Sequence, residues 1–151
     1  MTLVRDVLAR DPSIWSIPNL GVAKVGQPRS EEEWAVLRYE LDAFVAEGEY
    51  AAGLTRVLES YLRNLDQLSQ PAVWLSGFFG SGKSHLIRVL ESLWSDRRFP
   101  DGATAQGIVH LPQELQDLFR ELDTRGRQHG GRFSAAGVLA AGGSSVALSV
   151  L

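Results

Sequence analysis

Residues 77–84 of the chain read GFFGSGKS. Four of these positions, Gly77, Gly82, Lys83 and Ser84, meet the spacing G-x-x-x-x-G-K-[S/T] of a phosphate-binding loop (Walker A). In such a loop the glycines let the chain curl tightly, so that several backbone amides converge on the same phosphate oxygens. The stretch therefore predicts a site for a nucleotide polyphosphate, provided that a strand leads into the loop and a helix follows it.

Both flanks of the loop satisfy that condition in the sequence. Residues 72–76, AVWLS, form a short and largely apolar run that is typical of a strand covered on both faces. After the loop, apolar residues recur at helical spacing to about residue 95. The sequence therefore predicts an α/β fold, in which a P-loop NTPase core with an incomplete parallel sheet begins at residue 71 and runs to residue 151.

Each loop residue has an expected role in binding MgATP. Lys83 is expected to reach the β- and γ-phosphates and is the candidate catalytic residue, while the hydroxyl of Ser84 is the candidate ligand of Mg²⁺. A histidine after the loop is more often a packing residue than an acid or base, so packing is the favoured interpretation of His85. The candidate nucleotide-binding residues are Gly77, Phe78, Phe79, Gly80, Ser81, Gly82, Lys83, Ser84 and His85.

The two phenylalanines are unusual neighbours for a highly charged ligand. Because the backbone of the loop would bind the phosphate, the side chains of Phe78 and Phe79 are free to point elsewhere. The favoured interpretation is packing against the helix that carries Tyr61 and Leu65, and the alternative is an anchor for a partner. The four tryptophans are interpreted as core residues.

A helical region is expected between residues 30 and 70. Ser30 followed by Glu33 is a capping box, which predicts that a helix begins there, and Gly48 is the expected end of this helix. A second apolar stripe at helical spacing predicts a helix over residues 50–66. The NTPase core is therefore expected to follow an amphipathic helical pair.

The two ends of the chain are less regular. Residues 1–29 are predicted to be irregular, with one possible short strand at 22–25. Pro112 and the stripe behind it predict a helix to about residue 125, and a further strand is expected near 133–139. The sequence stops within an apolar pattern, so we expect the chain to be truncated at its C-terminus.

Composition limits the classes of function. The 15 basic and 18 acidic residues leave a net charge of −3, so no global attraction to DNA, RNA or an anionic membrane is expected. The chain has no cysteine and no apolar run near the ~18 residues that a membrane span needs. A cytoplasmic protein with no membrane association is expected, and DNA is expected to be contacted only indirectly or through regions missing from this chain.

The segment 71–94, PAVWLSGFFGSGKSHLIRVLESLW, resembles the P-loop of the large BREX phage-defence ATPases, the BrxC/PglY family. Residues 17–27 and 31–62 resemble the elements that precede the loop in this family, and residues 130–151 resemble a small-residue segment that follows it. The resemblance implies ATP and Mg²⁺ as cofactors and a multi-component defence complex as the partner. Family members are far longer than this chain.

Hydrolysis of ATP needs more than the loop. An acidic pair must hold Mg²⁺ and polarise the attacking water, and an arginine must stabilise the developing charge. No strand that ends in aspartate or glutamate follows the loop in this sequence, so this chain alone is expected only to bind nucleotide, whereas the full-length family members would be ATPases. The alternatives are a non-catalytic interaction module and a fragment of an AAA-type DNA-associated ATPase.

Overall fold

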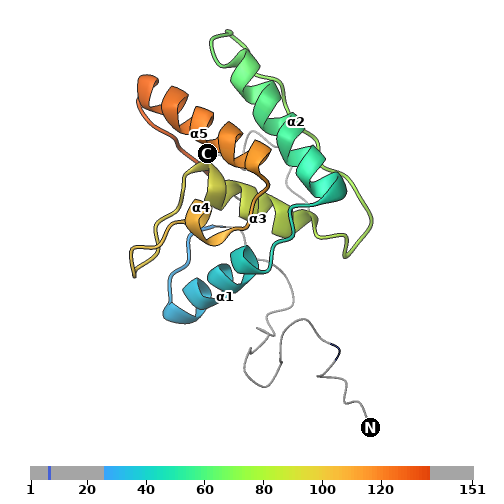
Figure 1. The fold of residues 1–151 in the computed structure, drawn as a ribbon, viewed down its shortest axis with the longest axis vertical. Coiled ribbons are helices and arrows are strands. Elements are labelled where there is room, and N and C mark those ends of the chain that lie inside the picture. Colours follow the sequence, from blue (N-terminus) through green and yellow to red (C-terminus); the bar gives the residue numbers. More distant parts are fainter. Residues whose placement is uncertain (1–6, 8–25, 137–151) are drawn as a thin grey trace, which may run out of the picture.

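The structure, a computed structural model, describes Val7 and residues 26–136. Within this part the chain forms helices joined by turns and loops (Figure 1). The helices are α1 (Glu31–Asp42), α2 (Gly48–Asn64), α3 (Lys83–Trp94), α4 (Ala105–Ile108) and α5 (Gln113–Gln128). The helix predicted after the candidate phosphate-binding loop is confirmed nearly to the residue as α3.

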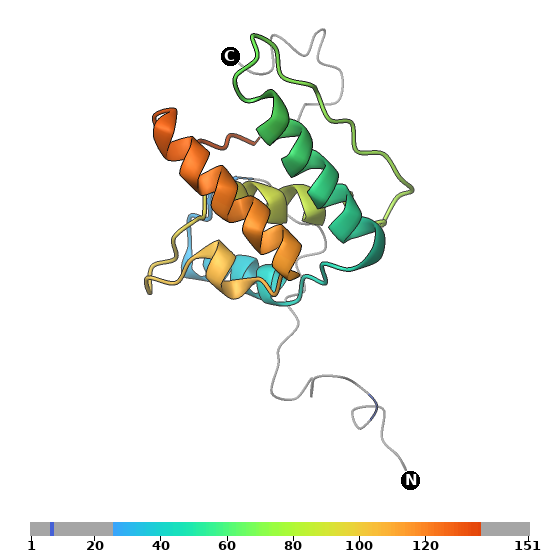
Figure 2. The ribbon, with the colours of Figure 1, turned by 45° about the horizontal axis from the view of Figure 1, so that its top comes forward.

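Helix α3 lies in the middle of the arrangement, with the other four helices on its two sides. Helix α2 lies along α5, while α3 contacts α1, α4 and α5 (Figures 1 and 2). As a result, α3 lies between the pair formed by α1 and α4 and the pair formed by α2 and α5. The predicted pair of helices before the loop is confirmed, but its two members pack mainly against α3, α4 and α5 rather than against each other.

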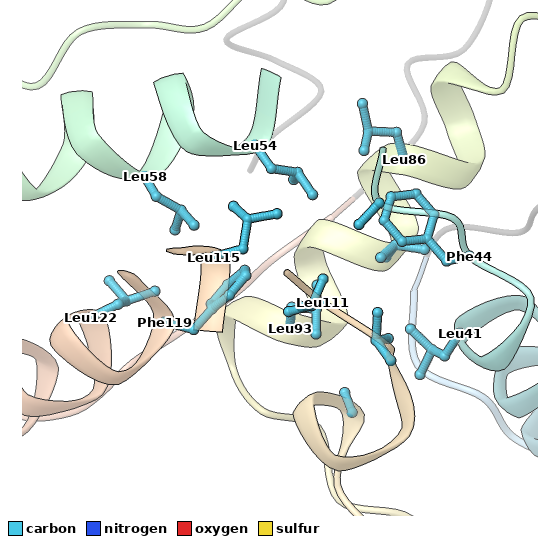
Figure 3. Packing of buried hydrophobic residues seen from close by; sticks show 14 of the residues in the cluster. Leu41, Phe44, Leu54, Leu58, Leu86, Leu93, Leu111, Leu115, Phe119 and Leu122 are labelled. Carbon is cyan, nitrogen blue, oxygen red and sulfur yellow. The ribbon is translucent and has the colours of Figure 1, made fainter. Parts of the chain in front are cut away.

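The core consists of the apolar stripes of these helices. Between α2 and α5, Leu54 and Leu58 face Leu115 and Phe119 (Figure 3). Each of these four side chains is almost fully buried, and burial of one such side chain contributes about 1.5–3 kcal/mol. The helical period in the sequence is thus explained by packing alone.

The ends of the helices follow local side-chain chemistry. The capping prediction at Ser30 is confirmed, because its hydroxyl accepts a hydrogen bond from the amide of Glu33 at 3.2 Å. The Glu33 carboxylate reaches back one residue further than expected, to the amide of Arg29 at 2.7 Å. Gly48 was expected to end the first helix, and this is wrong: it begins α2, with a φ of +52° that favours glycine.

The predicted α/β fold is wrong for the part of the chain that the structure describes. No strand forms between residues 26 and 136, and the single β-bridge joins Arg98 to Thr104. Residues 72–76 are exposed and make no ladder, because a strand takes its hydrogen bonds from a neighbouring strand and no described segment lies in that position. A P-loop NTPase core requires a parallel sheet, which these residues lack.

Two further predicted strands lie partly or wholly outside the described residues. The segment 133–136 is not a strand, and the rest of the predicted strand 133–139 lies outside the described residues. The possible strand at 22–25 also lies outside them. None of the helices that the structure describes is long and apolar enough to cross a membrane.

Helix α5 continues past the expected end at residue 125. It runs to Gln128 and so includes Gly126, the first residue of the glycine-containing segment 126–131 in which the sequence predicts that the helix fails. A Cβ atom at Gly126 would lie 2.6 Å from Cγ of Arg132. The glycine therefore lets the Arg132 side chain lie against the helix, where it pairs with Asp123 and donates to the carbonyl of Trp94 at 2.9 Å.

Candidate phosphate-binding loop

The loop at residues 77–82 has the backbone features that its glycines predict. Gly80 and Gly82 both adopt a φ of +78°, in the left-handed region that side chains disfavour. A Cβ atom at Gly77 would lie only 2.8 Å from Oγ of Ser81, so a larger residue there would displace the Ser81 hydroxyl. The amide of Ser81 donates to the carbonyl of Phe78 at 3.2 Å and closes the turn.

Lys83 folds back across this turn. Its ammonium donates hydrogen bonds to the carbonyls of Gly77 and Phe78, at 2.8 and 2.6 Å, and lies 3.3 Å from Oγ of Ser81. One cation thus contacts three residues of the loop. The ammonium group is therefore held by the backbone of the turn, beside the start of α3.

The start of α3 presents unpaired donors beside that charge. Gly82 is the N-cap residue, and no side chain caps the helix. The first backbone bond at this end runs from the amide of Leu86 to the carbonyl of Gly82 at 2.9 Å, which leaves the preceding amides of the first turn without helical acceptors. These amides and the positive end of the helix dipole favour an anion. Ser84, the candidate Mg²⁺ ligand, is exposed in the same turn.

Tyr50, in the first turn of α2, contacts the backbone of the loop. Its hydroxyl donates to the carbonyl of Ser81 at 2.7 Å. Its oxygen also lies where a Cβ atom of Gly82 would meet it at 2.7 Å. The ring lies edge-on to Phe44, with centroids 6.1 Å apart. Sequence analysis missed this residue, because nothing in the sequence connects positions that are 31 residues apart.

His85 points away from the loop. Its Nε2 atom lies 3.0 Å from the carbonyl oxygen of Glu40 in α1, and its ring is edge-on to Phe44 at 5.7 Å. The packing interpretation of this histidine is therefore confirmed. Of the groups of His85, only the backbone amide lies at the start of α3, where a nucleotide contact was expected.

A largely buried ion pair joins α1 to the same helix. The Nε atom of Arg88 lies 3.0 Å from a carboxylate oxygen of Glu40, although the two atoms are not aligned as a hydrogen bond. Burial raises the pKa of Glu40, and the charges of Arg88 and His85 oppose this shift. The helix that carries Lys83 is thus fixed to α1 by the pair Glu40–Arg88 and by His85.

The aromatic side chains of the loop are not packed. Phe78 is 90% exposed and Phe79 is 104% exposed, so the predicted packing against the helix that carries Tyr61 and Leu65 is wrong. Tyr61 instead lies edge-on to Trp94, with ring centroids 4.5 Å apart. The loop keeps its shape through Lys83 and the backbone, without help from its phenylalanines.

The tryptophans divide between core and surface. Trp34 and Trp94 are partly buried against the core, as predicted. Trp74 is 89% exposed, which contradicts the core interpretation, because the sheet that the predicted strand 72–76 was expected to join does not form in the described residues. Trp15 lies outside the described residues.

Among residues 26–136, no three histidine or acidic side chains gather where they could hold a metal ion. No family model matches the sequence, and no solved structure matches the fold.

Proposed function

We propose that this chain binds the polyphosphate of ATP, with Mg²⁺, through residues 77–84. The observation that carries the proposal is the position of Lys83, whose ammonium lies across the turn at the uncapped start of α3. A phosphate at this place would meet a lysine charge, unpaired helix amides and the positive end of a helix dipole together. This donor set matches the chemistry of a polyphosphate.

The residues present also suit Mg²⁺. The ion keeps several waters in nucleotide sites and takes its other ligands from the phosphates and one or two protein oxygens. The exposed hydroxyl of Ser84 would supply one protein oxygen next to the proposed phosphate position. The ion would neutralise part of the phosphate charge, and Lys83 would neutralise another part.

The biological setting of the proposal comes from the loop sequence. The resemblance of residues 71–94 to the BREX ATPases supports ATP as the nucleotide and a phage-defence complex as the partner. DNA would then be contacted through other members of the complex, and the protein would act in the cytoplasm, where ATP is supplied. For this chain we propose nucleotide binding alone. Hydrolysis of ATP would need residues beyond those described.

A second candidate function is a docking module that needs no nucleotide. It is favoured by the near-complete exposure of Trp74 and of the sequence neighbours Phe78 and Phe79, because exposed apolar patches are typical of interaction sites. The two candidates differ in one respect. Docking through the aromatic side chains would survive loss of the Lys83 charge, and nucleotide binding would not.

The test compares Lys83→Ala with Arg63→Ala. Arg63 is a matched control, because its loss also removes one positive charge but from an exposed position near the end of α2. Binding of MgATP is measured by calorimetry, and folding by circular dichroism. Since a hydrogen bond to a charged group contributes about 1.5–3 kcal/mol, Lys83→Ala should weaken binding at least about tenfold, and Arg63→Ala should leave it unchanged. A folded Lys83→Ala that binds like the wild type would overturn the proposal.

The chain offers an internal control for a second measurement, because Lys24 and Lys83 are its two lysines. Labelling with an amine-reactive reagent, followed by mass spectrometry, reports on both in one sample. MgATP should protect Lys83 from the reagent and leave Lys24 reactive. Equal labelling of Lys83 with and without MgATP would count against phosphate contact by its ammonium.

A further inference from the structure

An apolar groove runs beside the phosphate loop, between α2, the extended segment before the loop, and α3. In Figure 2 the chain that leaves α2 returns beside that helix before it enters α3. The groove has a volume of about 630 Å³. Its apolar lining includes Leu54, Val57, Val73, Leu75, Leu86 and Leu90. Charge is nearly absent from this lining, where Arg56 is the one ionisable residue.

The segment 72–76 forms one wall of the groove, and its backbone has no hydrogen-bond partner among the described residues. Within the described residues, the amides of this segment donate to no backbone carbonyl. Val73 is 59% exposed, and Leu75 and Ile87 are also exposed at the groove. An unpaired extended backbone beside an apolar groove is a surface on which a peptide segment can add, with main-chain hydrogen bonds for affinity and side-chain pockets for specificity.

The chain itself contains a segment with matching chemistry. Residues 133–151 contain no charged side chain, and their last part, 146–151, reads VALSVL. Valine and leucine alternate there with smaller residues, a pattern that suits an extended segment with one apolar edge. An uncharged segment complements a groove that is almost without charge, since neither needs to desolvate an ionic group on contact.

This segment is tethered within reach of the groove. Arg132 donates to the carbonyl of Trp94, and Ser134 donates to the hydroxyl of Ser95 at 3.2 Å, so the chain leaves the described part at the C-terminal end of α3. Leu90, which lines the groove, lies on the same helix, about 8 Å along its axis from Ser95. The nine residues 137–145 can span about 30 Å, which exceeds that distance several times over.

We propose that residues 146–151 dock in the groove between α2, the segment 72–76 and α3. Val146, Leu148 and Val150 would face the apolar lining, and the docked segment would cover Val73 beside the phosphate loop. The proposal does not depend on ATP binding. It predicts an intramolecular contact that exists in the isolated chain without nucleotide.

The absence of cysteine from the chain makes a disulfide test direct. The pair Val73→Cys with Leu148→Cys should form a cross-link within one chain under mild oxidation at micromolar concentration. The matched control is Val45→Cys with Leu148→Cys, because Val45 is 62% exposed and carries the same substitution outside the groove. The groove pair should react at least tenfold faster than the control pair, with a product of monomer mass.

Three outcomes would overturn the proposal. Equal rates for the two pairs would show that the segment has no preferred position. Cross-links that join two chains would assign the groove to a second copy. The absence of any cross-link in a folded protein would show that residues 146–151 do not occupy the groove. A second measurement is hydrogen exchange: deletion of residues 146–151 should speed exchange of the amides of Val73 and Leu75, and unchanged exchange would also contradict docking.

Discussion

Gly82 is the position where the geometry of the loop can be tested most directly. It combines a φ of +78° with a contact at the oxygen of Tyr50, where an added Cβ atom would lie 2.7 Å away. The next atom of that side chain, Cζ, lies at 3.7 Å, which is an ordinary van der Waals distance. Gly82→Ala should therefore have two separate costs, one from the backbone and one from the tyrosine hydroxyl.

The two costs can be assigned magnitudes. A left-handed φ costs a non-glycine residue about 1–2 kcal/mol. To relieve the clash, the Tyr50 hydroxyl must move and give up its 2.7 Å hydrogen bond to the carbonyl of Ser81, which contributes about 1 kcal/mol. Gly82→Ala should thus destabilise the wild type by about 2–3 kcal/mol. In a Tyr50→Phe background the clash and the hydrogen bond are both absent, so the same substitution should cost only about 1–2 kcal/mol.

The assay is a double-mutant cycle. The free energy of unfolding is measured in urea for the wild type, Gly82→Ala, Tyr50→Phe and the double variant. The effect of alanine on the unfolded chain is the same in both backgrounds and cancels in the cycle. A coupling energy of about 1 kcal/mol is expected. If the costs of the two substitutions simply add, within about 0.3–0.5 kcal/mol, Tyr50 does not contact the loop as described.

Two further predictions concern the helices behind the loop and its aromatic side chains. Arg88→Met should destabilise the fold by about 3 kcal/mol at pH 7, because it leaves Glu40 without its partner. The loss should shrink toward pH 4. Burial raises the pKa of Glu40 in the folded protein, and removal of the Arg88 charge raises this pKa further. The free energy of unfolding of the variant therefore falls as the pH rises from the pKa of Glu40 in the unfolded chain through its pKa in the folded protein. Urea unfolding at several pH values checks this, and a loss independent of pH would contradict it. Phe78→Ser and Phe79→Ser should change the free energy of unfolding by less than about 0.5 kcal/mol, since both rings are exposed, and a larger loss would mean that they are packed.

The sequence predicts the helices well where one apolar stripe and one cap agree. Ser30 marks the start of α1, and the stripe after Lys83 marks α3, because both signals arise from residues within a few positions of each other. The four-residue helix α4, capped by Thr104, is too short to show a period and was not predicted. The end of α5 is predicted too early for a related reason, since the local pattern does not show that the Arg132 side chain lies against Gly126.

The strand at 72–76 was mispredicted for a different physical reason. A helix closes its hydrogen bonds within one segment, whereas a strand depends on a neighbour. The apolar composition of these residues shows that burial of their side chains would be favourable, but it cannot show which segment of the chain would bury them. In the described part the cover is missing, so the same residues form the exposed wall of a groove.

The arrangement of Lys83 bears on how readily the loop would accept a phosphate. An ammonium group has three donors, and two of them bond to the carbonyls of Gly77 and Phe78 at 2.8 and 2.6 Å. The third faces Oγ of Ser81 at 3.3 Å, which is the longest and weakest of the three contacts. A phosphate oxygen could take this third donor while the two carbonyl bonds remain. Since the Ser81 carbonyl is held separately by Tyr50, the loop would bind its ligand with little rearrangement, and the contacts already present would reduce the entropic cost of binding.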